Sequence, residues 1–560
     1  MTASMTGSIA ESTAEKATAA SSVAITSSRY GTQRSRARNS LPCLMLPLAT
    51  SLLFSCVSAQ ESPETWYDEG QATVARNLAL RASNSNSNGR ARNVILFVGD
   101  GMGISTVTAA RILAGQLRGE TGEENALSFE NFPNLALSKT YNTNQQIADS
   151  AGTMTAMSTG IKTKAGVISV NQNVIRGDCG SQAGNHLLTF LERAEIRGLA
   201  TGVVTTARIT HATPAANYAH SMERNYEDDG DSDMVVNAGG CPDIARQLIE
   251  FAENNPGSDG IEVAMGGGRR SFIPQSMADP EYGRNGARAD GRNLTAEWTA
   301  AAANSRFVWN RDQFNTVDPA STDHLLGLFE PSHMQYDHDR PVDEAGEPSL
   351  SEMTAKAIDI LSRNEKGYFL QVESGRIDHA HHAINPQRAL LDTIELSRAV
   401  STTLEKVDLS ETLIIVTADH SHVFTIAGYA TRGNPILGKS VGNENNGEPR
   451  TSPSLAADDL PYTTLGYANG PGFHFLPEAN TADAITREDI NFSRRADLTD
   501  VDTTHPGFHS EVTVPMRAET HGGEDVAIYA IGPGSDLVRG VMEQNVIFHV
   551  MMEASQLEQR

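Results

Sequence analysis

Carboxylate and imidazole side chains occur in pairs along this chain, at spacings that suit metal binding. Asp378 and His382 are four residues apart, so on a helical turn they lie on one face. Asp419 and His420 form a second pair, directly after an apolar run. Such ligands suit a borderline divalent cation such as Zn²⁺. The pairs therefore predict a metal centre. The alternatives are a solvated polar turn for the first pair, and a capping Asp beside a surface His for the second.

Asp100 and His521 have the same character. Asp100 stands between two glycines after the apolar run at 94–98, where the backbone can approach a ligand closely. A helix cap is its alternative. His521 lies in a Glu-Thr-His-Gly-Gly segment, and one such histidine is usually structural. Several polar sites of one kind after apolar runs favour metal binding over unrelated structural roles.

Ser150 is a candidate nucleophile. It lies among small residues, Asp-Ser-Ala-Gly-Thr at 149–153, which open into a predicted helix. A hydroxyl there lies near the positive end of the helix, where backbone amides can receive a phosphate. From this motif alone, a helix cap is the simpler interpretation. The Gly-x-Ser-x-Gly elbow of triad hydrolases does not surround Ser150, so a metal ion is the remaining means of activating it.

The elements that must position these residues follow from apolar runs that alternate with helical stretches. Continuous apolar runs are expected of strands buried on both faces, and they lie at 94–98, 202–205, 368–372, 413–417 and 526–531. Helices are expected at 107–117, from Pro214, at 387–407 and at 540–553. The alternation predicts an α/β fold with a mainly parallel central sheet and helices on both faces. Ligands of such sheets bind beyond the carboxyl ends of the strands, where the polar residues fall.

The chain divides into four predicted segments. Residues 1–59 are an export leader, with a basic stretch, an apolar run and a small-residue exit. We favour ordinary cleavage after Ala59; the alternative is a lipid anchor on Cys56. Residues 60–91 are a flexible linker rich in Ser and Asn. The domain spans 92–553, and its Gly- and Pro-rich part at 431–510 is an insertion that covers the sheet edge or the site.

Composition bounds the function. The chain has 560 residues, of which 39% are apolar, enough for a large core, and a net charge of −25. That charge repels nucleic acid, so no nucleic-acid surface is expected. The end of the chain is polar, so no transmembrane anchor is expected after processing. Outside the leader the cysteines are Cys179 and Cys241; export favours a disulfide, and two free thiols are the alternative.

In their order and separation, the motifs together resemble the alkaline phosphatase family. They comprise the segments 99–103, 149–151, 211–216, 372–382, 417–422 and 519–521, and the likeness runs from about Arg92 to Met551. The resemblance implies an exported, periplasmic or extracellular homodimer that hydrolyses small phosphate monoesters. It also implies a phosphoserine intermediate on Ser150.

The same resemblance implies two zinc ions and one magnesium ion. One zinc would be held by Asp378, His382 and His521. The second would be held by Asp100, Asp419 and His420, with Ser150 as an exchangeable ligand. Magnesium would be shared by Asp100, Thr213 and Glu373. Arg224 matches the arginine that clamps phosphate, whose planar fork binds two oxygens; a surface arginine is the alternative. His211 and His379, beside the phosphate and magnesium sites, match animal-type members rather than enteric bacterial ones.

Animal-type members also have a calcium site. The matching positions are Glu281, the carbonyl of Phe329, Glu330 and Glu347, the last of which is usually Asp in the family. A solvated acidic loop is the alternative. Cys179 and Cys241 also fall where the family places a disulfide. The rival functions are a phosphodiesterase, a sulfatase and a non-catalytic scavenger of zinc or phosphate. Ser150, Arg224 and the metal set argue against them.

Overall fold

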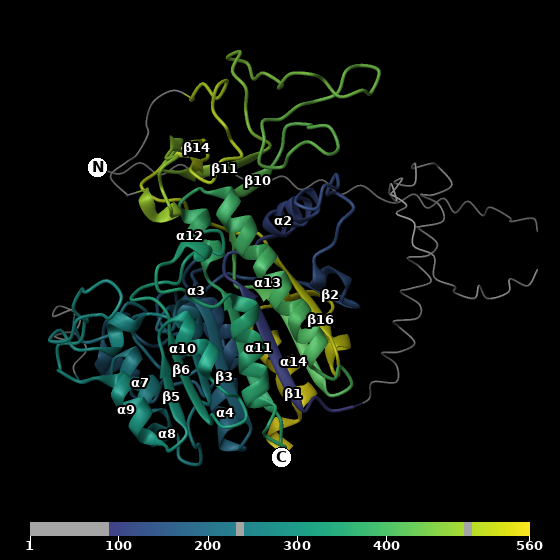
Figure 1. Ribbon diagram of the computed structural model, residues 1–560. Coiled ribbons are helices and arrows are strands. Elements are labelled where there is room, and N and C mark those ends of the chain that lie inside the picture. Colours follow the sequence, from purple (N-terminus) through teal and green to yellow (C-terminus); the bar gives the residue numbers. More distant parts are fainter. Residues whose placement is uncertain (1–88, 231–239, 486–494, 560) are drawn as a thin grey trace, which may run out of the picture. The chain divides into compact units, whose positions relative to one another are not determined.

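The computed structural model describes residues 89–230, 240–485 and 495–559. The predicted leader, and the predicted linker up to residue 88, lie outside these ranges. A ten-stranded sheet forms the centre, in the order β17-β2-β16-β8-β1-β7-β3-β4-β6-β5 (Figure 1). Its strands are β1 (Asn93–Gly99), β2 (Asn134–Lys139), β3 (Ala200–Arg208), β4 (Val263–Gly267), β5 (Ser305–Val308), β6 (His324–Leu328), β7 (Tyr368–Ser374), β8 (Thr412–Ala418), β16 (Val526–Ile531) and β17 (Gly540–Glu543). Only β16 runs antiparallel to its neighbours, which confirms the mainly parallel sheet.

Helices cover both faces of this sheet, which explains why its central strands are mostly apolar. In β1, Ile95 and Phe97 belong to one core, while Val94, Leu96 and Val98 belong to the other. Successive side chains of a strand point to opposite faces, so a doubly covered strand needs apolar residues at every position. The first core is closed by α2 (Ile104–Gln116), α11 (Leu350–Leu361) and α13 (Pro386–Lys406). The second is closed by α3 (Ser150–Thr159), α4 (Phe190–Ile196), α7 (Ile244–Ile249), α9 (Leu294–Ala301) and α14 (Val546–Ser555).

The remaining elements are short. The helices are α5 (Ala212–Ala215), α8 (Phe251–Asn254), α10 (Arg311–Thr316) and α12 (Arg376–His382). The strands are β9 (Ser421–His422), β10 (Phe424–Ile426), β11 (Leu465–Gly470), β12 (His474–Phe475), β13 (Phe508–His509), β14 (Val512–Pro515) and β15 (His521–Gly522). Strands β10, β11 and β14 form a second, three-stranded sheet.

The structure differs from the sequence expectation after residue 540. A helix was expected over 540–553, but residues 540–543 form β17 and the helix α14 begins only at Val546. Strand β17 pairs in parallel with β2, so Gly540 lies beside Ala136. Gly540, the first residue of β17, has a positive φ of 72°, which a right-handed helix does not allow. The pairing with β2 thus overrides the local helical pattern.

The segment 431–510 contacts the helix α12 through the part that the structure describes. Asp483 accepts a hydrogen bond of 2.7 Å from Arg376, and the hydroxyl of Tyr467 lies 2.8 Å from His381 Nδ1. The ring of His509 bonds to the carbonyl of Ala383 at 2.7 Å. These contacts fix a helix that carries candidate metal ligands.

Four neighbouring strands bring the polar motifs to one edge. In the order β8-β1-β7-β3, Gly99 pairs with both Ser374 and Ala418, so these strands end at the same level. Asp100 follows β1, and Asp419 follows β8. Glu373 lies at the end of β7. The carboxyl ends of parallel strands therefore gather these acids at one place, as expected for a ligand site.

Candidate active site

Ser150 is the first residue of α3 and lies within this edge. The side chain of Asp149 caps the helix by accepting from Gly152 N at 3.1 Å. The hydroxyl of Ser150 is buried, with Oγ 3.2 Å from His420 Nε2 and 3.5 Å from Asp100 Oδ1. The serine therefore combines a helix N-terminus, which favours an anion, with a carboxylate and an imidazole.

Asp100, Asp419 and His420 form one candidate metal centre around that hydroxyl. Their ligand atoms lie within 4.8 Å of one another, and all three side chains are fully buried. His420 Nε2 lies 3.4 Å from Asp100 Oδ1 and 3.3 Å from Asp419 Oδ2. Burial, reinforced by Asp419, raises the pKa of Asp100 well above its usual value, and burial also raises the pKa of Asp419. Two close buried carboxylates repel each other, and a divalent cation between them removes that cost.

Asp378, His382 and His521 form a second centre. Asp378 Oδ1 lies 3.3 Å from His382 Nε2 and 3.4 Å from His521 Nε2, and the two ring nitrogens are 3.1 Å apart. The Nδ1 atom of each ring faces a carbonyl, that of Glu519 at 3.0 Å and that of Ala148 at 2.7 Å. A ring that donates from Nδ1 and carries no other proton presents a lone pair at Nε2. Three acceptor atoms therefore face one another.

This second centre attracts positive charge. Burial acts to lower the pKa of His382, but Asp378 and Glu519 outweigh burial and raise it well above its usual value. Burial acts to raise the pKa of Asp378, yet His382, with His422 and His521, holds it well below the usual range. A proton on His382 supplies the charge that the cluster requires, and a bound cation can supply it instead.

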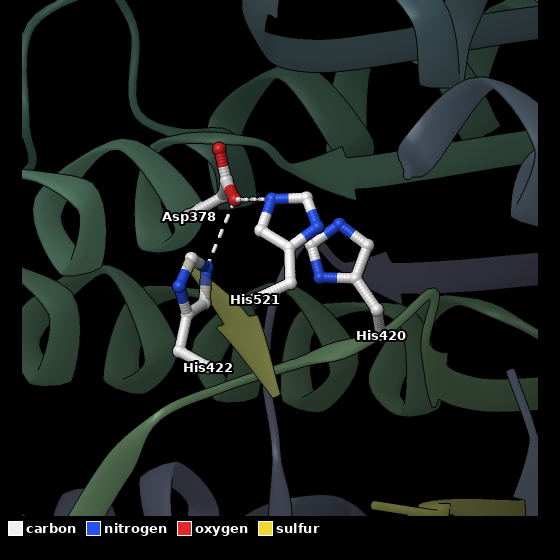
Figure 2. Close-up of side chains that lie close together, drawn as sticks. All are labelled: Asp378, His420, His422 and His521. Atoms are coloured by element: carbon white, nitrogen blue, oxygen red, sulfur yellow. Dashed lines mark hydrogen bonds and ion pairs between the residues drawn. The ribbon is translucent and has the colours of Figure 1, made fainter. Parts of the chain in front are cut away.

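His422 and Glu519 support the second centre and were not assigned from the sequence. His422 Nε2 lies 2.8 Å from Asp378 Oδ1, and its Nδ1 lies 2.7 Å from Glu519 Oε2. Figure 2 shows His422 and His521 both directed at Asp378. The rings of His420 and His521 are stacked, with their centroids 3.6 Å apart. Burial opposes protonation of His422, but Glu519 and Asp378 raise its pKa to about 9. The sequence signal that could have identified His422 is its position only two residues after His420.

A third group of ligands lies around Glu373. Ligand atoms of Asp100, His211 and Glu373 lie within 4.8 Å of one another. Thr205 Oγ1 donates to Glu373 Oε2 at 2.5 Å, and burial raises the pKa of Glu373 to about 8. Within the described ranges Asp100 Oδ2, Glu373 Oε1 and the hydroxyl of Thr213 have no hydrogen-bond partner, although all are buried. Buried oxygen atoms without a hydrogen-bond partner suit Mg²⁺, which prefers oxygen ligands.

Arg224 approaches the site from the side of Asp149. Its backbone N donates to Gly166 O at 2.9 Å, and its Nη1 lies 3.3 Å from Asp149 Oδ2. Its Nη2 lies 3.1 Å from His211 Nε2. Burial, with the charge of Arg224 next, keeps the pKa of His211 well below its usual value, so this ring is neutral. The guanidinium of Arg224 therefore supplies positive charge on the side of the site near Asp149.

The alkaline phosphatase family model matches residues 91–557 of the chain. Tissue-nonspecific alkaline phosphatases of Felis catus and Homo sapiens are 43% and 42% identical to it over 522 and 523 residues, which is 92% of this chain and 93% of each of theirs. The chain belongs to the alkaline phosphatase family. It is therefore an enzyme of phosphate monoester hydrolysis, which confirms the resemblance and the enzyme class inferred from the motifs.

Solved alkaline phosphatases share the fold. The enzyme of Thermus thermophilus has a TM-score of 0.57 at 24% identity and covers 84% of this chain and 92% of its own. That of the Antarctic bacterium TAB5 has a TM-score of 0.54 at 22% identity and covers 84% and 99%. The α/β prediction is thereby confirmed.

His379 lies beside His211 in this alkaline phosphatase, and a third ring, His333, joins them. The ring centroids of His211 and His379 are 5.5 Å apart, and that of His333 is 4.0 Å from His379. Burial, followed by the charge of Arg376, lowers the pKa of His379 to about 3. His333 was not found from the sequence because it comes from the loop after β6, with no neighbouring motif.

Acidic side chains gather at the position expected for a calcium site. Ligand atoms of Glu281, Glu330 and Asp343 lie within 4.8 Å of one another, and Asp343 was not foreseen. Glu347 is buried beside them; its Oε1 accepts from Gln335 N at 2.9 Å. Burial, with the charges of Glu330 and Asp343, raises its pKa well above the usual value. Phe329, which directly precedes Glu330, is also buried.

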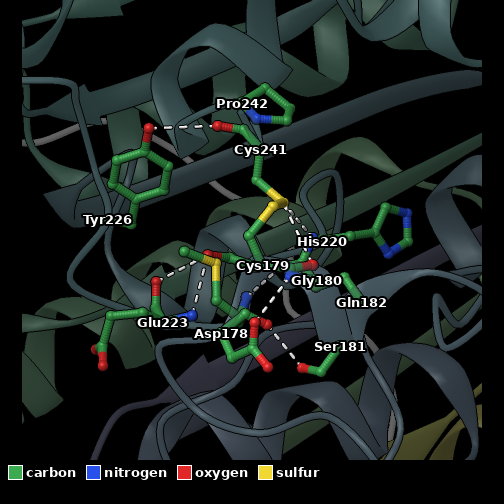
Figure 3. The surroundings of a disulfide bond; sticks show 12 residues. Asp178, Cys179, Gly180, Ser181, Gln182, His220, Glu223, Tyr226, Cys241 and Pro242 are labelled. Atoms are coloured by element: carbon green, nitrogen blue, oxygen red, sulfur yellow. Dashed lines mark hydrogen bonds between the residues drawn. A yellow bond between two sulfur atoms is a disulfide. The ribbon is translucent and has the colours of Figure 1, made fainter. Parts of the chain in front are cut away.

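Cys179 and Cys241 form a disulfide in the structure. Figure 3 shows this bond and its surroundings. The two Cα atoms are 5.9 Å apart. The bond joins the loop after residue 170 to the start of α7. The pairing expected from the family resemblance is present, and the alternative of two free thiols is not.

Proposed function

We propose that the enzyme hydrolyses small phosphate monoesters through a phosphoserine on Ser150, with two zinc ions and one magnesium ion bound around it. The observation that supports this most is the set of buried acceptor atoms beside the Ser150 hydroxyl, with Asp100 and His420 at 3.5 and 3.2 Å from it. Carboxylates that repel one another and ring nitrogens that face one another are poorly stabilised without cations. The donor sets fit the proposed ions, because N/O sets suit zinc and an oxygen set suits magnesium.

The proposed ligands fall into three sets. Zinc would be held by Asp378, His382 and His521, and a second zinc by Asp100, Asp419 and His420. Magnesium would be held by Asp100, Thr213 and Glu373. When bound, the metals would lower the pKa of the Ser150 hydroxyl and stabilise negative charge on the reacting oxygens.

The residues of the chain perform the remaining steps. Ser150 Oγ attacks phosphorus, the bond to the alcohol oxygen breaks, and the alcohol leaves with the electron pair and gains a proton. Water then attacks the phosphoserine from the side that the alcohol vacated, which releases inorganic phosphate and restores Ser150. Arg224 and the amides at the start of α3 hold the other phosphate oxygens. Because nothing in this scheme recognises the alcohol, a broad substrate range is expected.

Metal content tests the proposal directly. The purified enzyme is expected to hold about two zinc ions and one magnesium ion per chain, measured by elemental mass spectrometry. Asp378→Asn should lose about one zinc, because one carboxylate ligand becomes a neutral amide. Glu373→Gln should lose magnesium and keep zinc.

Asp392→Asn is the matched control for metal content. Asp392 is buried in α13 outside the three proposed ligand sets, and burial raises its pKa well above the usual value, so the amide makes the same kind of change at a buried acid that holds no metal. It should keep all metals. Full zinc content in Asp378→Asn would contradict the first ligand set, and unchanged magnesium in Glu373→Gln would contradict the third.

We further propose that a calcium ion binds Glu281, Glu330, Asp343 and Glu347. Calcium at about 100 times its Kd is then expected to add about 2–3 kcal/mol to the free energy of unfolding. Glu330→Gln should remove most of this gain, because it removes one charged ligand. Glu344→Gln, on the same loop but exposed, should retain it. Thermal unfolding with and without calcium measures both.

The pH dependence gives a second readout of the calcium proposal. Burial, followed by the charge of Glu281, raises the pKa of Glu330 from 4.5 to about 8. Between these values the folded calcium-free protein keeps a proton that the unfolded chain has lost. Its stability should therefore fall as pH rises through this range. Calcium should offset the fall. An unfolding temperature independent of calcium at pH 8 would contradict the site.

Export and dimer formation also remain proposals. The disulfide between Cys179 and Cys241 supports an oxidising compartment, because structural disulfides are rare in the cytosol. Within the described ranges, none of the helices combines the length and apolar character of a membrane span. A homodimer is proposed from the family alone.

A further inference from the structure

The chain segment that carries Arg224 rests on a small core of its own. Met222 and Tyr226, on either side of Arg224, are buried with Val167, Val170 and Val174. The disulfide between Cys179 and Cys241 packs against this cluster. Figure 3 shows Tyr226 beside the disulfide, with its hydroxyl directed at the carbonyl oxygen of Cys241. The loop at 166–182 therefore supports this segment.

An ion pair next to Arg224 adds to the contacts that hold this segment. Arg176 donates to Glu223 through Nε at 2.7 Å and through Nη2 at 2.8 Å. Glu223 directly precedes Arg224, and its Oε1 also accepts from Asn225 N at 3.1 Å. Gly177 N donates to Met222 O at 3.1 Å. The paired carboxylate thus fixes the backbone on both sides of Arg224.

Gly166 links the ion pair to the phosphate site. Its N donates to Asp149 Oδ2 at 2.8 Å, and its O accepts from Arg224 N. A Cβ on Gly166 would lie 2.2 Å from Arg176 Cζ, so the guanidinium lies directly against its Cα. Gly166 also has a positive φ of 80°, which disfavours any side chain. Asp149 and Arg224 are therefore joined to Arg176 through one glycine.

We propose that Arg176 is a positioning residue for Arg224. Paired with Glu223, it fixes the backbone from which Arg224 reaches phosphate, and it makes no contact with phosphate itself. The inference rests on the proposed function, because it assumes that Arg224 holds phosphate. A bidentate pair restricts two side chains and the backbone between them more than a single hydrogen bond does.

The experiment measures inhibition by inorganic phosphate in fully metallated enzyme, together with KM and kcat for an aryl phosphate. Arg224→Ala should raise Ki about a hundredfold. Arg176→Ala and Glu223→Gln should each raise Ki about fivefold, with a smaller change in kcat. Arg246→Ala is the matched control. Arg246 Nε donates to both carboxylate oxygens of Glu250, at 2.8 and 2.9 Å, and the two side chains are 44% and 17% exposed. The corresponding values for Arg176 and Glu223 are 45% and 14%. The control should leave Ki unchanged.

The signs of the two single substitutions separate positioning from simple attraction. If Arg176 acted by its charge alone, losing it would weaken phosphate binding, whereas losing the charge of Glu223 would strengthen it. Positioning predicts that both weaken it. It also predicts that Arg176→Ala adds nothing to Arg224→Ala in the double variant, because its effect passes through Arg224.

The outcomes are distinguishable. Opposite signs, additive effects or an unchanged Ki in both single variants would overturn the positioning role. An unchanged Ki in Arg224→Ala itself would overturn the assignment of Arg224 in the proposed function. Unfolding temperature and metal content are measured on every variant. If Arg176→Ala does not fold, the direction of the Ki change in Glu223→Gln by itself decides between positioning and simple attraction.

Discussion

Replacing Ser150 with alanine is expected to reduce the turnover of an aryl phosphate by at least about 10⁴-fold, because the oxygen that attacks phosphorus is lost. Folding and metal content should change little. Ser150 Oγ makes only long contacts, 3.2 Å to His420 and 3.5 Å to Asp100, so its removal leaves no strong hydrogen bond broken. The measurement is the steady-state release of phosphate from metal-loaded enzyme.

Ser158→Ala is the control on the same helix. Ser158 is also buried, and its hydroxyl donates to Thr155 O at 3.3 Å, within the same helix. It should retain nearly full activity. A second readout is the covalent intermediate: acid quenching with phosphate should add a phosphoryl group to the peptide that contains Ser150, and none in Ser150→Ala. Turnover by Ser150→Ala within tenfold of the parent would exclude Ser150 as the nucleophile.

The strands that carry the site could be predicted because their signal is local. The run before Asp100 is apolar at every position, and a strand buried on both faces requires that pattern. The runs before Asp419 and Glu373 follow the same pattern, interrupted only by Thr417 in one and Gln371 in the other. Once the sheet is parallel, the carboxyl ends of its strands coincide, and the polar residues after them converge. The candidate site was therefore accessible from short segments alone.

Residues that act through distant partners could not be predicted in this way. His422 was not assigned because its role depends on the pairing of β9 with β15, which places it opposite His521. Nothing near either residue indicates that pairing. Asp343 could not be predicted for a similar reason, because the path of its loop decides whether its carboxylate lies near the other acids. Local periodicity also failed at residues 540–543, where a neighbouring strand decides the conformation.

The charge of the chain bears on its substrate as well. A net charge of −25 repels a phosphate monoester, and the acids around Ser150 add to this locally. Arg224 is the guanidinium in contact with Asp149, and it alone cannot balance Asp100, Asp378, Asp419 and Glu373. Bound cations would reverse the sign of the field where the anion binds. Activity should therefore depend on the metals more steeply than on Arg224.

Removal of the metals is accordingly the second large effect expected. Exhaustive chelation should lower aryl phosphate turnover by more than about 10³-fold, because activation of Ser150 and stabilisation of charge are lost together. Zinc alone should restore part of the activity, and zinc with magnesium should restore it fully. Magnesium alone should restore none, because the histidines suit zinc. The chelated protein should also unfold at a lower temperature, because Asp100, Asp419 and Glu373 then face one another unshielded.

Calcium alone is the control for this titration. It should raise the unfolding temperature of the chelated protein through the group of Glu281, Glu330 and Asp343 and return no activity, because that group is separate from Ser150. Recovery of activity with calcium or magnesium alone would contradict the assignment of the histidine sets to zinc. Activity that survives complete removal of metal would contradict the metal-dependent mechanism itself. If activity returns with zinc and rises further with magnesium, the next test is whether magnesium acts through the acids around Glu373. In that case the activity of Glu373→Gln should no longer respond to magnesium.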